Sequence, residues 1–374
     1  MNRIAIFSHG GVAQPGSTQD VPALAGLIRR LSELFDITVY IPVKSDGYTA
    51  QFECGRGTVT FVNARHDGGT PAIAARMVAA FRRDHGIRPF SLVHGFWALP
   101  GGIAAAIAGS FFRLPSIVSI LGGEAADLPA IRYGNMRGRL PRASTLWTCR
   151  TASALVALTR FQVERLRSHG FTRTEGVRVI PFGAESHFFG CSAAKPLPPP
   201  VNLLHVANIN SVKDQGTMLR ALKRISAQVE CRLRIVGEDT LGGSLRRLAS
   251  SMGIAHLVTF AGFVPHGELP AYYDWAHLLI HSSLYEGEGV VFAEASAAGV
   301  PICGTRVGLL SDLGDSIALT VEPGDDDALA GGVLALLGDP MRMERLRTGA
   351  RAWSGGHDAG WTASQYAQLY GDYL

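Results

Sequence analysis

The chain has 374 residues, of which 47% are hydrophobic and 18% are charged, and its formal net charge is +4. This composition is typical of a well-packed α/β protein and excludes disordered and fibrous classes. A chain of this length exceeds one ordinary hydrophobic core and predicts two domains. The five cysteines are scattered and odd in number, which favours reduced thiols in a cytoplasmic protein over a disulfide framework.

The positive net charge is distributed unevenly. Residues 1–195 carry 22 Lys and Arg against 12 Asp and Glu, giving +10, whereas residues 196–374 carry 13 against 19, giving −6. This split predicts two surfaces with different partners. The alternative is two solvated domains that differ in charge for no functional reason.

The first half alternates apolar runs with segments of helical periodicity, the pattern of a parallel, doubly wound sheet. A strand is predicted at residues 3–8, followed by a turn at Gly10 and Gly11, and a helix at 21–34. This turn lacks the G-x-G-x-x-G spacing that a Rossmann dehydrogenase requires. Further strands are predicted at residues 37–41, 58–62, 90–94, 116–120, 154–158 and 177–181.

The stretch from Arg132 to Arg150 contains five arginines and no acidic residue, with Leu140 and Trp147 among the interleaved apolar residues. Such a stretch suits an anionic membrane face or a phosphate-bearing acceptor, and the alternative is a solvated helix and loop. No nucleic-acid-binding motif accompanies it, so no nucleic-acid partner is expected. Residues 101–120 are the most apolar region, but Arg113 and Pro115 interrupt them, which favours core elements over a membrane span.

A proline-rich connector is predicted at residues 191–200, because proline density of this kind stiffens a chain. It separates a first domain at residues 1–190 from a second at 201–355. The second domain restarts the alternation of strands and helices, with strands predicted at 201–207, 232–237, 257–264 and 278–281. Residues 356–374 close the chain as a helix with an aromatic stripe.

The stretch 278–305 carries the strongest functional pattern. An apolar strand at 278–281 leads into a glycine-punctuated turn at 286–289, and a helix follows at 290–298. Backbone N–H groups at such a helix start suit an anionic or sugar ligand. Glu286 lies in the turn, and Glu294 lies in the apolar helix. A buried carboxylate needs hydrogen-bond donors, which a sugar diol can supply. The alternative is that Glu294 is a solvated position.

This stretch resembles the donor-site signature of retaining glycosyltransferases of family 4, which have the GT-B fold. The pattern is E-G-x-G, an acid eight residues after the first, and then A-x-G-x-P. An acid, Glu288, stands where the family usually has an aromatic or apolar residue. The matching residues are Glu286, Gly287, Gly289, Glu294, Gly299 and Pro301.

The resemblance implies two Rossmann-like, doubly wound domains that face a central cleft. The acceptor is expected on domain 1–190 and the donor on domain 201–355, with the helix at 356–374 crossing back to the first domain. Lys213 stands where the family has a pyrophosphate-binding lysine, and Asn208 where it often has an arginine. His94 stands where the family closes a strand with a histidine that faces the acceptor side.

The resemblance also assigns roles. Glu286, Lys213 and His94 are the expected catalytic residues: Glu286 holds sugar hydroxyls, Lys213 stabilises the pyrophosphate, and His94 contacts sugar or acceptor. Glu294 is expected to hold the ribose. The expected donor-binding residues are Gly10, Gly11, Asn208, Lys213, Gly237, Val264, Glu286, Gly287, Glu288, Gly289, Val290 and Glu294.

The predicted function is therefore a retaining hexosyltransferase that uses a UDP- or GDP-linked sugar and a saccharide or lipid-linked acceptor. Surface polysaccharide or glycolipid synthesis at the cytoplasmic leaflet fits the basic first domain. No metal or other cofactor is expected, because Asp325, Asp326 and Asp327 are typical of a helix cap. Two alternatives are a non-catalytic protein that binds nucleotide-sugars or a partner, and an epimerase or phosphorylase of the same fold.

Overall fold

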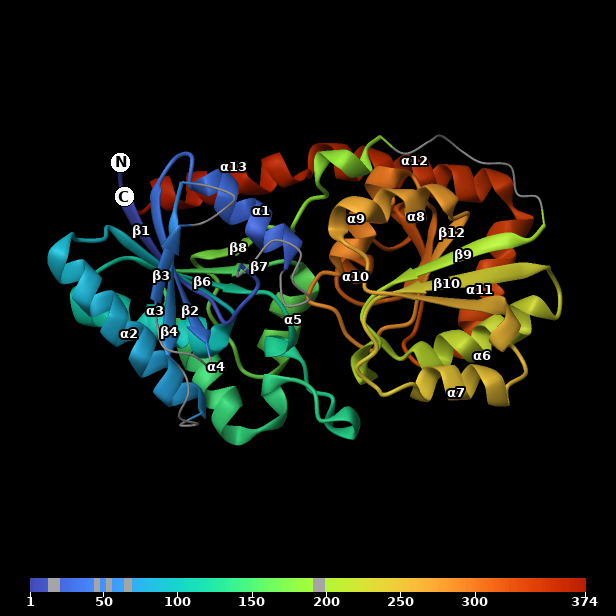
Figure 1. Ribbon diagram of the computed structural model, residues 1–374, viewed down its shortest axis with the longest axis horizontal. Coiled ribbons are helices and arrows are strands. Elements are labelled where there is room, and N and C mark those ends of the chain that lie inside the picture. Colours follow the sequence, from blue (N-terminus) through green and yellow to red (C-terminus); the bar gives the residue numbers. More distant parts are fainter. Residues whose placement is uncertain (13–20, 44–47, 52–55, 64–68, 191–198) are drawn as a thin grey trace. The chain divides into compact units, whose positions relative to one another are not determined.

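The computed structural model describes residues 1–12, 21–43, 48–51, 56–63, 69–190 and 199–374. The chain divides into two compact units (Figure 1). Unit 1 comprises Met1–Phe182 together with Ala359–Leu374, and unit 2 comprises Gly183–Asp358. Most of the predicted connector at 191–200 lies outside the described residues.

Unit 1 is built on an eight-stranded sheet of order β3-β4-β2-β1-β5-β6-β7-β8 among the described residues. All neighbouring strands are parallel except the β3–β4 pair, which is antiparallel. Buried, mostly apolar residues form the central strands β1, β5, β6 and β7, because a parallel sheet is covered on both faces. The strands are β1 (Arg3–Phe7), β2 (Asp36–Val43), β3 (Tyr48–Gln51), β4 (Thr58–Asn63), β5 (Leu92–Phe96), β6 (Ser116–Ile120), β7 (Ala154–Ala157) and β8 (Val177–Val179).

Helices connect these strands, and a helix from the far end of the chain joins them. The helix α13 lies beside α1 (Figure 1). Tyr366 and Tyr370 of α13 are fully buried, and Thr362 donates from Oγ1 to the carbonyl oxygen of Pro181 at 2.8 Å. The helices of unit 1 are α1 (Pro22–Leu31), α2 (Gly69–Ile87), α3 (Ile103–Phe112), α4 (Arg139–Thr151), α5 (Arg160–Ser168) and α13 (Ala359–Gly371).

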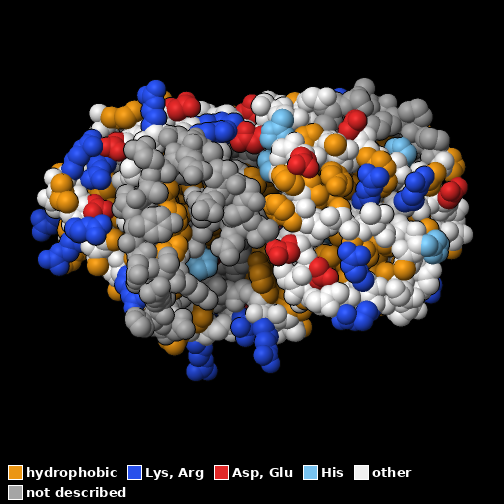
Figure 2. Space-filling model, viewed as in Figure 1, with side chains coloured by type: hydrophobic (Ala, Val, Ile, Leu, Met, Phe, Trp, Pro, Cys, Tyr) orange, Lys and Arg blue, Asp and Glu red, His pale blue; other side chains and the backbone are white. Residues whose placement is uncertain are grey.

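Unit 2 repeats the arrangement with a six-stranded parallel sheet of order β11-β10-β9-β12-β13-β14. Acidic, basic and apolar side chains are interspersed on the face of this unit seen in Figure 2. Its strands are β9 (Val201–Val206), β10 (Cys231–Val236), β11 (Val258–Gly262), β12 (Leu278–His281), β13 (Ile302–Thr305) and β14 (Ala318–Val321). Its helices are α6 (Gln215–Ser226), α7 (Ser244–Ser251), α8 (Leu269–Trp275), α9 (Val290–Ala298), α10 (Leu309–Leu313), α11 (Asp326–Gly338) and α12 (Pro340–Gly356).

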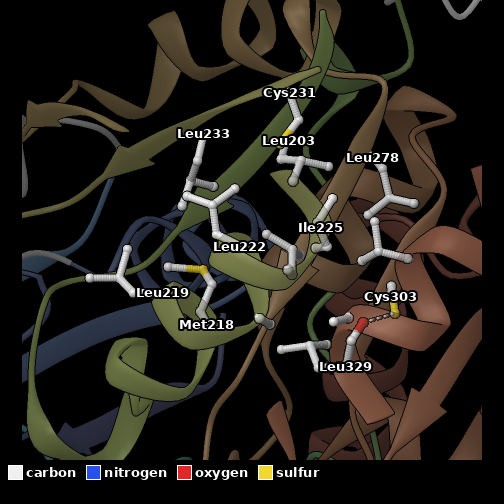
Figure 3. Close-up of a cluster of buried hydrophobic side chains, with 14 of the residues drawn as sticks. Leu203, Met218, Leu219, Leu222, Ile225, Cys231, Leu233, Leu278, Cys303 and Leu329 are labelled. Carbon is white, nitrogen blue, oxygen red and sulfur yellow. Dashed lines mark hydrogen bonds between the residues drawn. The ribbon is translucent and has the colours of Figure 1, made fainter. Parts of the chain in front are cut away.

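Alternate residues of the strands in unit 2 enter different hydrophobic clusters. Leu203 and Leu278 pack with Leu222 and other residues of α6 and α11 (Figure 3). Their neighbours Leu204 and Leu279 pack instead in a second cluster with residues of α8, α9 and α10. Because a strand alternates its side chains between the two faces of a sheet, unit 2 has a core on each face and is doubly wound.

The boundary between the units differs from the one predicted. Residues 183–190 were expected in the first domain, but they belong to unit 2. The physical reason is Phe188, which is fully buried in the core of unit 2 and meets Tyr273 with ring centroids 5.5 Å apart. Three strands were not predicted: β3 and β14, which lie at sheet edges, and β13, which lies between β12 and β14.

Candidate functional site

The glycine loop of unit 2 joins β12 to α9 at the carboxyl edge of the sheet. Gly289 ends the loop with φ of 82°, and a Cβ there would lie 2.3 Å from the ring of Phe292. Both facts require glycine at this position. Phe292 N donates to the oxygen of Gly289 at 2.8 Å, and the N–H groups of Val290 and Val291 precede the first possible carbonyl partner in the helix. The loop and the helix start therefore form an anion-binding arrangement.

Glu286 in this loop is the centre of a buried polar network. Its Oε1 accepts from Lys213 Nζ at 2.5 Å, from Ser283 Oγ at 2.6 Å and from His281 Nε2 at 3.0 Å. The side chain of Glu286 is 9% exposed, that of Lys213 is 21% exposed and that of His281 is fully buried. All three described bonds therefore end on one carboxylate oxygen, and the other oxygen, Oε2, is left for further donors.

The network keeps Glu286 ionised. Burial by itself raises the pKa of the Glu286 carboxyl, but the Lys213 charge and the His281 hydrogen bond outweigh burial and hold this pKa well below its usual range. Burial lowers the pKa of His281, so its ring is neutral at neutral pH. Because a carboxylate only accepts hydrogen bonds, His281 carries its proton on Nε2.

A second layer supports this network. His205 donates from Nδ1 to the carbonyl oxygen of Ile280 at 3.0 Å, and its Nε2 lies 3.3 Å from Gln215 Nε2. The rings of His205 and His281 are 5.1 Å apart, and burial, together with the nearby His281, lowers the pKa of His205 to about 3. Ser282 Oγ also donates to the backbone oxygen of Lys213 at 2.9 Å. The loop that carries Lys213 is therefore held against the loop that carries Glu286.

Glu294 is 5% exposed, so the alternative that it is a solvated position is wrong. Its Oε1 accepts from His266 Nε2 at 2.9 Å, and its Oε2 accepts from Tyr273 Oη at 2.8 Å. The donors in this structure are thus protein side chains. Each carboxylate oxygen has two acceptor positions, so both retain room for a ligand hydroxyl.

The structure places the other predicted residues of unit 2 around the ends of neighbouring strands. Asn208 is exposed, and its Oδ1 accepts from the backbone N–H of Glu238 at 2.9 Å. Gly237 has φ of 141°, and a Cβ there would lie 2.2 Å from the oxygen of Ala207, so the backbones of β9 and β10 approach closely. Val264 is half-buried against the cluster that contains α8 and α9.

Within the loop, Gly287 is buried, and Val290 is the first, half-buried residue of α9. Glu288 is only 2% exposed, and its backbone oxygen accepts from Leu309 N at 2.8 Å. Gly308 allows this contact, because a Cβ there would lie 2.3 Å from the oxygen of Glu288. The residue that departs from the family pattern is therefore part of the buried loop.

The predicted catalytic role of His94 does not fit its placement. His94 was expected to end its strand, but it lies in the middle of β5, which continues to Phe96. It is fully buried in unit 1, with Nδ1 2.7 Å from Tyr370 Oη and Nε2 2.8 Å from Ser119 Oγ. Burial lowers its pKa to about 3. Both ring nitrogens are used inside the unit, so His94 is a structural residue that ties α13 to the sheet. Gly10 and Gly11 also lie in unit 1, directly after β1.

Four residues of the site were missed by sequence reasoning: His281, Ser283, His266 and Tyr273. His281 and Ser283 immediately precede the glycine loop, and a polar residue at a strand end is a signal that points to such a role. His266 and Tyr273 carry no such signal, because only packing of α8 against α9 brings them to Glu294. In the described ranges, no group of three His, Cys, Asp or Glu side chains is arranged to hold a metal ion.

Comparison with known proteins agrees with this geometry. The model of the glycosyl transferases group 1 matches residues 195–353, and that of the glycosyl transferase 4-like domain matches residues 21–183. A solved sucrose-phosphate synthase from Thermosynechococcus elongatus superposes with a TM-score of 0.84 at 19% identity, covering 100% of this chain and 99% of that one. HepE from Anabaena in complex with UDP-glucose superposes with a TM-score of 0.77 at 17% identity over 99% of both chains.

The fold is therefore GT-B. Together the two models cover both units, and the chain belongs to the group 1 glycosyltransferases of family 4.

Two curated relatives share parts of the sequence. A GDP-mannose-dependent phosphatidylinositol monomannoside mannosyltransferase of Mycolicibacterium smegmatis is 33% identical over 152 residues, which are 38% of this chain and 40% of that protein. A glycogen synthase of Mycobacterium tuberculosis is 27% identical over 274 residues, 72% of this chain and 65% of that protein. The chain thus spans less than two thirds of either relative.

The Glu286 network predicts a pH-dependent stability. The folded pKa of Glu286 lies below its ordinary value of 4.5, so the ionised carboxylate stabilises the fold fully above about pH 4.5 and progressively less below it. Glu286→Gln should therefore lower the free energy of unfolding by about 1–3 kcal/mol at pH 7, and this difference should narrow toward pH 4. Urea unfolding of the native protein and the variant at pH 7 and pH 4 measures this difference in the free energy of unfolding.

The matched control for this experiment is Glu322→Gln, which removes a carboxylate paired with Arg306 at 3.4 Å but 76% exposed. Exposed pairs contribute little, so this variant should unfold like the native protein at both pH values. A Glu286→Gln difference that stays constant from pH 7 to pH 4 would show that Glu286 has no depressed pKa.

Proposed function

We propose that this protein is a retaining glycosyltransferase that moves a hexosyl unit from a UDP- or GDP-linked sugar to an acceptor hydroxyl. The observation that carries the proposal is the Lys213–Glu286 pair beside the N-terminus of α9, within a chain of the group 1 family. Two similar proteins support the donor class, since one is GDP-mannose-dependent and another was solved with UDP-glucose.

In the proposed reaction, Lys213 and the first N–H groups of α9 bind the pyrophosphate. An ammonium group has three donors, and the bond to Glu286 uses one of them. The contact with pyrophosphate strengthens as the leaving group gains negative charge, and such an interaction lowers the barrier. Glu286 Oε2 accepts from sugar hydroxyls, and Glu294 accepts from the ribose.

As the bond from the sugar C1 to the phosphate oxygen breaks, the acceptor oxygen bonds to C1 on the same face, and the acceptor proton passes to the leaving phosphate. No protein nucleophile is assigned. We place a saccharide or lipid-linked acceptor on unit 1 and infer a role in surface polysaccharide or glycolipid synthesis at the cytoplasmic leaflet. The basic charge of residues 1–195 supports this assignment. Two relatives carry names from glycolipid and glycogen synthesis.

The surface of unit 1 supports a peripheral contact with anionic lipid through residues 132–150. Helix α4 exposes Leu140 (81%) and Trp147 (44%) beside Arg139 and Arg142, and the neighbouring α3 exposes Phe111 (72%). Helices that mix basic and apolar exposed residues bind in the plane of a membrane interface. No helix among the described residues combines the length and apolarity needed to cross a bilayer.

Turnover of labelled UDP-glucose and GDP-mannose with a panel of saccharide acceptors tests the proposal. Lys213→Ala should lower kcat on the order of 10²-fold, because it removes a contact that is strongest in the transition state. Glu294→Ala should instead weaken donor binding, because the ribose contact exists before reaction. Lys223→Ala, an exposed lysine of α6, is the control and should behave as the native protein.

Two results would contradict the proposed transferase function or the role of Lys213 in it. Native kcat in the Lys213→Ala variant removes Lys213 from the mechanism. A native protein that binds nucleotide-sugars but turns none over would support the non-catalytic alternative.

The proposed reaction needs no metal ion, because Lys213 and backbone N–H groups stabilise the negative charge of the pyrophosphate. Treatment with EDTA should leave the rate of sugar transfer unchanged. The side chain of Asp325 caps α11 by accepting from Ala328 N at 2.8 Å, which fits its predicted role as a helix cap. Loss of activity with EDTA that magnesium or manganese restores would refute metal independence.

The lipid contact predicts sedimentation of the native protein with anionic but not with neutral vesicles. Each basic residue near an anionic surface contributes about 1 kcal/mol, so four arginines changed together should abolish binding at physiological salt. The variant changes Arg132, Arg137, Arg139 and Arg142 to Gln. If the native protein does not sediment with anionic vesicles even at low salt, the lipid contact does not exist. The proposed transfer would then use a soluble acceptor.

A further inference from the structure

Trp97 of unit 1 directly follows β5 and has backbone angles φ 60° and ψ 137°. A positive φ is unfavourable for a residue with a Cβ, and such strain collects at functional sites, where the surroundings hold it. Backbone hydrogen bonds hold both the N–H and the carbonyl oxygen of Trp97. Its N–H donates to the oxygen of Ser119 at 2.9 Å, and its oxygen accepts from Gly102 N at 2.7 Å.

The buried carboxylate of Glu124 adds a second restraint. Its Oε1 accepts from Ala98 N at 3.3 Å and Leu121 N at 3.2 Å, and its Oε2 accepts from Gly122 N at 2.7 Å. These bonds join the residue after Trp97 to the loop that follows β6. Glu124 is 3% exposed and its described bonds are all to backbone N–H groups, so it acts as a clamp that positions Trp97.

The indole of Trp97 lies across the ends of three neighbouring strands, β1, β5 and β6. Its Cη2 is 3.4 Å from the position of a Cβ on Gly11, which follows β1. Its Nε1 is 3.5 Å from the corresponding position on Gly122, which follows β6. No heavy atom of the described residues lies within 4 Å of a Cβ built on Gly10, the residue before Gly11.

We propose that Trp97 is a stacking platform for a pyranose ring of the acceptor saccharide. This inference rests on the proposed transferase function and adds one acceptor contact to it. The carboxyl ends of parallel strands are where Rossmann-like units bind ligands. A half-buried indole offers a rigid apolar face to the C–H groups of a sugar and an N–H to its oxygens.

A second aromatic ring borders the same loop. The ring of Tyr133 lies against Gly123, with Cζ 2.8 Å from the position of a Cβ there. Trp97 and Tyr133 therefore flank the consecutive glycines 122 and 123. Glycine at these positions lets both rings lie close to the backbone of this loop.

The test measures saccharide binding without donor. Methyl α-D-mannopyranoside and methyl α-D-glucopyranoside are titrated into the native protein, and contact is followed by saturation-transfer NMR. The native protein should bind at least one of them. Trp97→Leu, which keeps an apolar side chain but no ring, should lose about tenfold in affinity, and Trp97→Phe should retain most of it.

Trp361→Leu is the control, because it removes another half-buried tryptophan of the same unit, on α13, and should bind as the native protein does. Circular dichroism verifies that each variant is folded. Native affinity in a folded Trp97→Leu protein overturns the proposal, and so does a native protein that binds neither glycoside. Donor binding and turnover are measured separately on the same proteins. These measurements test the transferase function independently of the role of Trp97.

Discussion

The ion pair between Lys213 and Glu286 is the interaction on which the site depends. A carboxylate buried at the end of β12 is costly unless its charge is compensated and its oxygens accept hydrogen bonds. Lys213 supplies the charge from a loop 73 positions earlier in the chain, and His281 and Ser283 supply two further donors. The pair therefore requires that the loops after β9 and β12 lie together. The parallel order of the sheet provides this, because β9 and β12 are neighbours.

Both units contain buried carboxylates, and the hydrogen-bond partners of these carboxylates differ. Glu286 pairs with a cation, which leaves it charged beside the start of α9. Glu294 accepts from His266 and Tyr273, which fix the direction of its oxygens. Glu124 of unit 1 accepts from backbone N–H groups, which immobilise two loops. In each case the hydrogen bonds compensate the burial of the carboxylate and fix the segments that carry the donors.

Much of the framework around the Glu286 loop was predictable from local sequence pattern. The strand at 278–281 and the helix at 290–298 were predicted with the bounds that the structure has, because apolar runs and glycine stops are local signals. The cap at Asp325 was predicted for the same reason. The roles proposed for Glu286, Glu294 and Lys213 rest on the resemblance to the family to which the chain belongs.

The amino-acid sequence by itself determined two doubly wound α/β units, the glycine loop and the identity of its acids. The tertiary structure alone decided which residues meet. His94 and Tyr370 are 276 positions apart, and only the packing of α13 on unit 1 shows that this histidine is buried and bonded. The placement of Phe188 in the core of unit 2 likewise decided the boundary at residue 183. The physical reason is that hydrogen bonding and burial depend on partners distant in the chain, which no local periodicity encodes.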